Sequence, residues 1–141
     1  MEIRTEIHYY LYVISYKAGM MRKKLVFTET SLDDLRAFPH DMRTEIGYQL
    51  GRVQQGTDPH DWKPFSTVGA GVREIRVRDQ DGIYRAMYVA KFEEAVYVLH
   101  CFQKKTEATS HHDVQLARKR DKELRRERSE TRRVGKESRS R

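Results

Sequence analysis

The sequence contains a single cysteine, only three prolines and no apolar run long enough to cross a bilayer. The one thiol, Cys101, lies inside an apolar stretch, so we expect it to be packed in the core. A disulfide framework and a cysteine zinc site are excluded. The longest unbroken apolar run extends only from Tyr9 to Ile14, and the acidic start of the chain does not resemble a signal peptide. These absences predict a cytoplasmic protein that makes no membrane contact.

Motifs for nucleotide and metal binding are missing as well. Gly69 and Gly71 precede a predicted strand instead of joining a strand to a helix, so they do not form a phosphate loop. His111 and His112 are adjacent, so on a helix their side chains would diverge by about 100 degrees and could not bind one ion together. The sequence therefore predicts no metal and no cofactor.

Charge is abundant, and it is unevenly distributed. The net charge is +7, from 28 lysines and arginines against 21 acidic residues. Residues 1–113 carry 16 of each sign, whereas residues 114–141 carry 12 basic and 5 acidic side chains. The excess therefore belongs entirely to the C-terminal segment. We expect residues 128–141 to form a basic disordered tail, which either adds affinity for ribosomal RNA or is a solvated appendage.

Residues 72–105 predict three antiparallel strands around which the rest of the chain is organised. In the first strand Ile75 and Val77 alternate with Glu74, Arg76 and Arg78, a pattern that gives one apolar and one polar face. A turn at residues 79–82, rich in Asp and Gly, and a second at residues 92–94 join the strands. The third strand, residues 95–102, is apolar along nearly its whole length, so we expect it at the centre of the sheet.

The remaining elements predict an α+β domain. A strand is expected at residues 24–28, followed by a helix from Thr30 or Ser31 to Phe38. A second helix, residues 41–55, has an apolar stripe on one face: Met42, Ile46, Leu50 and Val53. Packed as a hairpin, the two helices would cover one face of the sheet. Residues 57–71 predict an ordered loop, and residues 114–127 predict a C-terminal helix with Ala117 and Leu124 facing inward.

The same boundaries divide the chain into three parts. Residues 1–21 form an N-terminal extension that either pairs on an exposed sheet edge or takes no part in function. Residues 22–127 form the folded domain, and the tail follows from residue 128.

Basic side chains gather on the polar face of the predicted sheet. Arg76 and Arg78 share one strand, Arg85 lies on the next, and the third strand ends in Lys104 and Lys105. Because neighbouring strands lie less than about 5 Å apart, these cations would meet. Clustered cations repel one another unless an anion joins them, and guanidinium groups match the oxygens of a phosphodiester. The alternative is an ordinary exposed face whose cations pair with nearby carboxylates: Glu74, Asp79, Glu93 and Glu94.

Several short motifs point to a known family. They are EIR at residues 74–76, YRAMY at 84–88, VYVLHCFQKK at 96–105 and ARKR at 117–120, with LDDLRAFP at 32–39 upstream. Together they resemble the RelE/HigB superfamily of toxin–antitoxin toxins, most closely its phage-derived HigB-like branch. The resemblance covers about residues 22–125. It implies a RelE-like fold, with an N-terminal strand and a two-helix hairpin packed on a small antiparallel sheet, and a C-terminal helix.

The resemblance also implies an enzyme. Toxins of this kind are ribosome-dependent endoribonucleases, or mRNA interferases, which cut translated mRNA without a metal through attack of a ribose 2′-hydroxyl on the adjacent phosphate. By similarity Arg85 would stabilise the phosphorane charge, Arg76 would hold the 2′-hydroxyl region, and Lys104 or Lys105 would assist the leaving 5′-oxygen. The candidate RNA contacts are Arg78, Lys63, His111 and His112. The best known members place a tyrosine or histidine late in the chain, and only the two histidines lie near that place here, so the general base stays open.

The implied partners are the ribosome, mRNA and a cognate helix-turn-helix antitoxin through which the toxin would oligomerise. Two other functions fit the same sequence. One is a ParE-like inhibitor of DNA gyrase, for which the basic cluster would be unnecessary. The other is a non-catalytic, phage-derived module in which the cations only position RNA or another partner.

Overall fold

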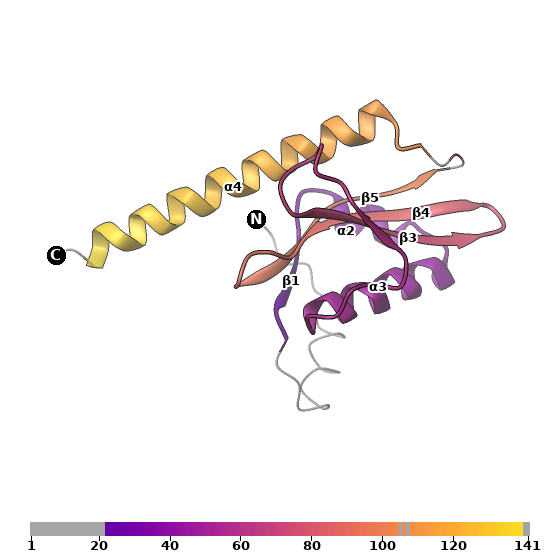
Figure 1. Cartoon of the computed structure of the whole chain (residues 1–141), viewed down its shortest axis with the longest axis horizontal. Coiled ribbons are helices and arrows are strands. Elements are labelled where there is room, and N and C mark those ends of the chain that lie inside the picture. Colours follow the sequence, from indigo (N-terminus) through magenta and orange to yellow (C-terminus); the bar gives the residue numbers. More distant parts are fainter. Residues whose placement is uncertain (1–21, 105, 107, 140–141) are drawn as a thin grey trace.

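The computed structural model describes the backbone of residues 22–104, 106 and 108–139, and side chains up to residue 135. The predicted edge pairing of residues 1–21 and the candidate Lys105 lie outside the described residues. The elements follow in the order β1 (Lys24–Phe27), α2 (Ser31–Arg36), α3 (His40–Gln54), β2 (Trp62–Pro64), β3 (Val72–Asp79), β4 (Gly82–Val89), β5 (Ala95–Lys104) and α4 (His111–Arg139). Figure 1 shows one sheet with α3 below it and α4 above it. The architecture confirms the α+β class and is consistent with a RelE-like fold.

The five strands form one sheet in the order β1-β5-β4-β3-β2. The pairs β3–β4, β4–β5 and β2–β3 are antiparallel, but β1 runs parallel to β5, so the sheet is mixed. The expectation that the third predicted strand, β5, lies at the centre is therefore wrong. An extra strand at each edge places β4 in the middle. β5 is nevertheless covered on both faces, which explains its continuous apolar sequence.

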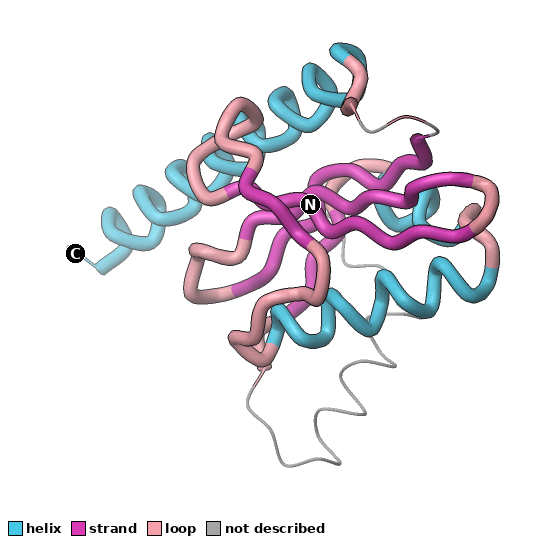
Figure 2. Tube along the Cα trace, turned by 45° about the vertical axis from the view of Figure 1, so that its right-hand side comes forward, coloured by secondary structure: helices cyan, strands magenta, loops and turns pink. Residues whose placement is uncertain are grey.

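Two hydrophobic layers, one on each face, hold the sheet between the helices. On one face Leu32 and Leu35 of α2 and Ile46 and Leu50 of α3 pack against the sheet, where Ile75 is fully buried. Ile46 and Leu50 confirm the predicted stripe of α3, although Met42 is only partly buried. On the other face Ala117 and Leu124 of α4 pack against apolar residues of the sheet, as predicted: Val72, Met87, Val89, Tyr97 and Leu99. Figure 2 shows α4 crossing the sheet on the side opposite to α3.

The sequence missed one short strand and one bulge. Trp62–Pro64 lies in the expected loop but pairs with β3 as an edge strand, a place that tolerates Pro64. Between β4 and β5 the register shifts, because Met87 pairs with His100 but Tyr88 pairs with Val98. The extra residue, Leu99, packs in the layer under α4, and His100 also contacts α4. A bulge of this kind re-aims a side chain that alternation would have sent to the other face.

The C-terminal helix is longer than predicted. The sequence indicated a helix ending near residue 127 and a disordered tail from residue 128, but α4 continues to Arg139. The predicted end of the helix fell too early because it was placed by buried side chains, whereas arginine, lysine and glutamate favour helix without burial. The part of α4 that packs on the sheet provides the first helical turns, from which the rest of the helix can extend. The ion pair between Arg126 Nη1 and Glu130 Oε1, 3.2 Å apart, stabilises the extended part. None of the helices in the described chain is long and apolar enough to span a membrane.

Candidate functional site

The strand register places those of the predicted strand cations that the structure describes on one face of the sheet. Arg76 of β3 pairs directly with Arg85 of β4, and Arg85 pairs with Phe102 of β5. Lys104 lies two residues beyond Phe102, so it shares that face, which is the face covered by α4. Like charges directly opposite each other destabilise a sheet unless other groups compensate. The neighbours of each cation therefore decide what this face can do.

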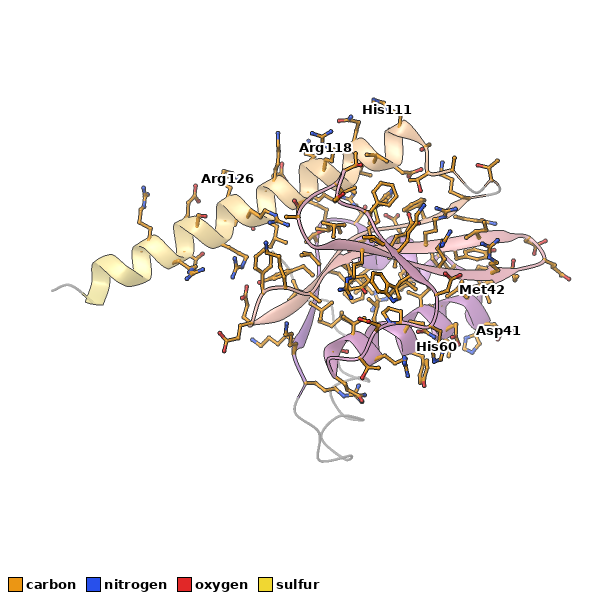
Figure 3. The ribbon with its side chains drawn as sticks, in the orientation of Figure 1. Asp41, Met42, His60, His111, Arg118 and Arg126 are labelled. Carbon is orange, nitrogen blue, oxygen red and sulfur yellow. The ribbon has the colours of Figure 1, made fainter. Side chains whose placement is uncertain are left out.

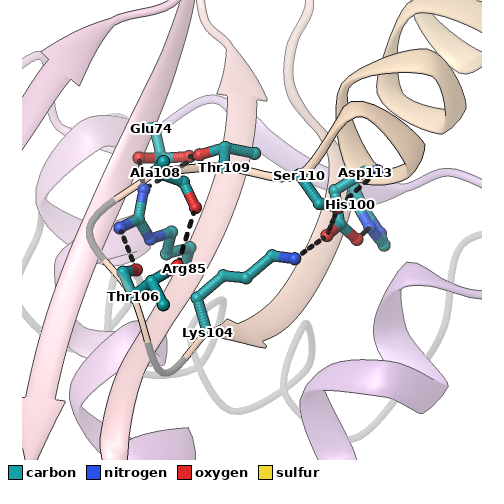
Figure 4. Close-up of polar contacts among 9 residues, drawn as sticks. All are labelled: Glu74, Arg85, His100, Lys104, Thr106, Ala108, Thr109, Ser110 and Asp113. Atoms are coloured by element: carbon teal, nitrogen blue, oxygen red, sulfur yellow. Dashed lines mark hydrogen bonds and ion pairs between the residues drawn. The ribbon is translucent and has the colours of Figure 1, made fainter.

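Arg85 is fully buried in a polar network with Glu74, whose side chain is also fully buried (Figure 4). Its Nη1 donates to Glu74 Oε1 at 2.8 Å and to Thr109 Oγ1 at 2.9 Å. Its Nη2 donates to the carbonyl oxygen of Thr106 at 3.3 Å, and Thr109 Oγ1 donates to Glu74 Oε2 at 3.2 Å. The guanidinium is thus fixed in position, with the segment after β5 lying over it.

A second network surrounds Asp113, in the first turn of α4 (Figure 4). Its Oδ2 lies 2.8 Å from Lys104 Nζ and accepts a hydrogen bond from Ser110 Oγ at 2.6 Å, and its Oδ1 lies 2.7 Å from His100 Nε2. Burial alone would raise the pKa of Asp113, but the hydrogen bonds from Lys104, Ser110 and His100 outweigh burial and lower the pKa to about 2. Asp113 is therefore ionised and holds Lys104 against the start of the helix.

His100 is the neutral member of this network. Burial lowers the pKa of its imidazole, and the opposing effect of Asp113 does not overcome it. The ring stacks on Phe102, with the centroids 4.6 Å apart. Nε2 faces Asp113, so in the neutral ring this nitrogen carries the hydrogen and donates it to Asp113 Oδ1, which fixes the orientation of the imidazole. The buried Nδ1 has no hydrogen-bond partner among the described atoms.

Arg76 and Arg78 open onto a different hollow, between α3 and β3. Arg76 Nη2 lies 3.6 Å from Asp61 Oδ1, and its side chain is 20% exposed. The hollow is about 470 Å³ and is also lined by residues Figure 3 labels: Asp41, Met42 and His60. The described strand cations therefore share a face by backbone register, but their charged ends divide into three groups, each with its own carboxylate: Glu74, Asp113 and Asp61. The group with Asp61 opens toward α3.

A family model matches most of this region. The match is to the family described as Phage derived protein Gp49-like (DUF891), and it spans residues 33–122, well over half of the chain. The chain belongs to this Gp49-like family. The family is toxin-like and is related to RelE-type toxins. Comparison with curated proteins and with solved structures gave no match.

The matched region of this Gp49-like protein includes both polar networks and α4 up to residue 122. Ala117 and Arg120, from the motif at residues 117–120, are buried. Arg120 Nη1 donates to the carbonyl oxygen of Leu99 at 2.9 Å, and its Nη2 donates to Thr30 Oγ1 at 2.9 Å. These contacts tie α4 to β5 and to the start of α2. Arg120 thus has a structural position, and it keeps the Asp113 network in register with the sheet.

The remaining candidates of the Gp49-like chain lie apart from the Arg85 network or at its rim. Lys63 Nζ is 4.0 Å from Glu74 Oε1, so it approaches the network from β2. His111 and His112 are exposed at the start of α4, and His111 points away from the sheet (Figure 3). Trp62 packs under Arg73, whose guanidinium carbon lies 4.1 Å from the ring centroid.

Sequence reasoning missed Thr109, His100 and Asp113 as parts of the site. Asp113 also takes part in the start of α4, because its backbone N–H donates to Ser110 Oγ at 3.2 Å. His100 was hidden in an apolar strand. The available signal was that a histidine within such a strand requires a polar partner. No group of three or more histidine, cysteine or acidic residues that could hold a metal ion occurs in the part of the chain that is described.

Proposed function

We propose that this Gp49-like protein is the toxin of a toxin–antitoxin pair and that it cleaves mRNA on the translating ribosome. The observation that carries the proposal is the shared sheet face of Arg76, Arg85 and Lys104, which lies within the region matched by a toxin-like family. A row of cations on one face suits a polyanionic chain, because guanidinium groups bind phosphate oxygens bidentately.

The proposed reaction needs no metal. The 2′-oxygen of a ribose loses its proton and attacks the adjacent phosphorus, the bond from phosphorus to the 5′-oxygen breaks, and that oxygen takes up a proton. In this scheme Arg85 stabilises the added phosphorane charge and Arg76 holds the 2′-hydroxyl. Lys104, or its neighbour Lys105, protonates the leaving oxygen. His111 and His112 remain the candidates for the general base, and their exposure at the start of α4 supports contact with RNA.

Burial sets the order in which RNA can reach these groups. The side chains of Arg76 and Lys104 are each 20% exposed, whereas Arg85 is fully buried. RNA therefore meets Arg76 and Lys104 first. A phosphate reaches Arg85 only by replacing the oxygens of Thr106 and Thr109 as acceptors for its guanidinium. The partner of the proposed toxin is a helix-turn-helix antitoxin that holds the chain inactive and joins copies of it.

The test is expression of the full chain alone, followed by mapping of mRNA 5′ ends. We expect growth arrest and cuts in phase with codons, and rescue when a helix-turn-helix protein encoded beside this chain is co-expressed. Arg76→Ala and Lys104→Gln should each lower cutting by about 100-fold, the effect of removing one charge-stabilising donor. Arg52→Ala, on α3 and away from this face, is the control and should cut normally.

Arg85→Ala is the weaker first test, because it would leave the buried carboxylate of Glu74 without its ion pair. Loss of cutting in that variant could then arise from unfolding. Arrest with DNA damage and intact mRNA would contradict the proposal and support a ParE-like gyrase inhibitor. Unchanged cutting in both Arg76→Ala and Lys104→Gln would refute the assigned site.

A further inference from the structure

The second half of α4 has no packing role that explains its length. Among the described residues, Arg128 is the last of the helix with an ion pair or ring contact to the sheet region, where it binds Glu94 at 2.6 Å and covers the ring of Phe92. Every described side chain from Ser129 to Gly135 is exposed. Figure 1 shows this part of α4 extending past the sheet. A projecting helix with nothing to bury is either a solvated end or a surface for a partner.

The side of α4 that faces away from the sheet carries mainly positive charge. The residues that contact the body are at positions 114, 117, 120, 121, 124, 125 and 128. On the opposite side five exposed cations fall within an arc of about 100 degrees: Arg118, Lys119, Lys122, Arg126 and Arg133. Up to residue 135, the described side chains place no carboxylate inside that arc. Figure 3 shows Arg118 and Arg126 pointing away from the sheet. We call these five residues the α4 stripe.

Most of the α4 stripe is not neutralised by the carboxylates of the described residues. Arg126 pairs with Glu130 at 3.2 Å. Among the described side chains no carboxylate lies within ion-pair distance of Arg118, Lys122 or Arg133. From Arg118 to Arg133 the stripe extends over about 22 Å at 1.5 Å per residue. A line of uncompensated cations of this length complements a polyanion with regularly spaced charges.

We propose that the α4 stripe is a docking surface for the phosphate backbone of double-stranded RNA. Single-strand binders stack unpaired bases on aromatic side chains, and the described part of α4 beyond its two initial histidines contains no aromatic residue. A straight row of cations without base-reading partners binds backbone charge without sequence preference. The choice of RNA over DNA rests on the proposed function, whereas binding to phosphate does not.

The stripe lies apart from the proposed cleavage groups. Glu74, Arg85 and Lys104 are on the sheet face at the start of α4, and the stripe follows the outer side of the helix from there. RNA bound along the helix would thus be a second contact that holds the protein on a structured RNA while the sheet face meets the strand to be cut.

The test compares binding of the full-length protein to a labelled RNA hairpin at several salt concentrations. The stripe variant combines Arg118→Gln, Lys122→Gln and Arg133→Gln. The matched control removes the same charge elsewhere through Lys24→Gln, Arg52→Gln and Lys91→Gln. Circular dichroism confirms that both fold, and a denaturing gel shows that the RNA stays intact, so that binding is measured separately from cutting.

We expect the stripe variant to bind the hairpin about tenfold or more weakly at physiological salt, because up to three phosphate contacts are lost. The slope of log affinity against log salt should fall by about 0.9 for each contact. The control variant should bind within about twofold of the unmodified protein. An unpaired RNA of the same length should bind more weakly than the hairpin.

Four outcomes would overturn the proposal: equal loss in the control variant, an unchanged salt slope in the stripe variant, tighter binding to a DNA hairpin, or displacement of the RNA by polyglutamate of the same charge, which would indicate an acidic protein partner. None of these results depends on cleavage. Loss of mRNA cutting in Arg76→Ala with normal hairpin binding would support both proposals independently.

Discussion

The two faces of the sheet do different work. Against α2 and α3 the buried face is mainly apolar, and Leu50 and Ile75 are fully buried there. Against α4 the face is divided: apolar residues pack under Ala117 and Leu124, but the end toward the start of α4 buries Glu74, Arg85 and His100. The comparison teaches that the first face is held mainly by apolar packing. The second gives up apolar packing to hold charged groups in fixed positions, as sites of chemistry or binding do.

The largest effect should come from breaking the buried pair. Arg85→Ala leaves the fully buried Glu74 carboxylate without its guanidinium, which should lower the free energy of unfolding by about 3–5 kcal/mol. The double variant Glu74→Met and Arg85→Met replaces the pair with apolar groups and should recover most of that loss. Urea unfolding followed by circular dichroism measures both. A double variant no more stable than the single one would show that the pair is not the cause.

A similar but smaller loss is expected on the apolar face. Leu50→Ala removes a fully buried side chain between α3 and the sheet, which should cost about 3 kcal/mol. Because the polar networks lie on the opposite face, we expect mRNA cutting to persist below the lowered melting temperature. Loss of cutting in a variant shown to be folded would mean that the two faces are coupled.

The third prediction concerns acid. The folded-state pKa of His100 is lowered from 6.5 by burial, so its contribution to stability is present above pH 6.5 and is lost as the pH falls through the folded pKa. Asp113, with its pKa lowered to about 2 from 3.8, contributes stability that is lost between those two values. Protonation of each residue lowers the stability of the folded protein, so the urea midpoint should decline in two steps on acidification. His100→Gln should remove the first step and keep the second.

The smallest effect on stability belongs to the α4 stripe. Replacing Arg118, Lys122 and Arg133 with glutamine changes only exposed side chains without a carboxylate partner in the described structure. Each substitution should change the free energy of unfolding by less than about 0.5 kcal/mol. Thermal unfolding of the stripe variant tests this directly. A large drop in melting temperature would show that the stripe stabilises the helix, and its role in binding would need separate support.

Much of the fold was predictable because its signals are local. Alternation in β3, the apolar stripe of α3, and the inward placement of Ala117 and Leu124 were all predicted correctly from spacing. Gly56, with a φ of 83 degrees, follows the end of α3, where glycine commonly ends a helix. The shared face of Arg76 and Arg85 also follows from alternation and a tight turn. The catalytic and RNA-binding roles of these residues remain predictions.

Non-local features escaped the sequence. The central position of β4 depends on β1 pairing in parallel beside β5, far from it in the chain. The burial of Arg85 depends on where Thr106 and Thr109 pass over β4. The expected acidic partners were also partly wrong, because Glu74 does bind Arg85 but Glu94 binds Arg128.

The sequence by itself determined the class of fold, the identity of the core residues and the sign and place of the excess charge, since periodicity and composition act over a few residues. Only the tertiary structure decided which carboxylate neutralises each cation and which cations stay open to a ligand. Glu74 reaches Arg85, and Asp113 reaches Lys104, because strands and a helix from separate parts of the chain pack together. Such pairings depend on distances in space that the order of residues does not encode locally.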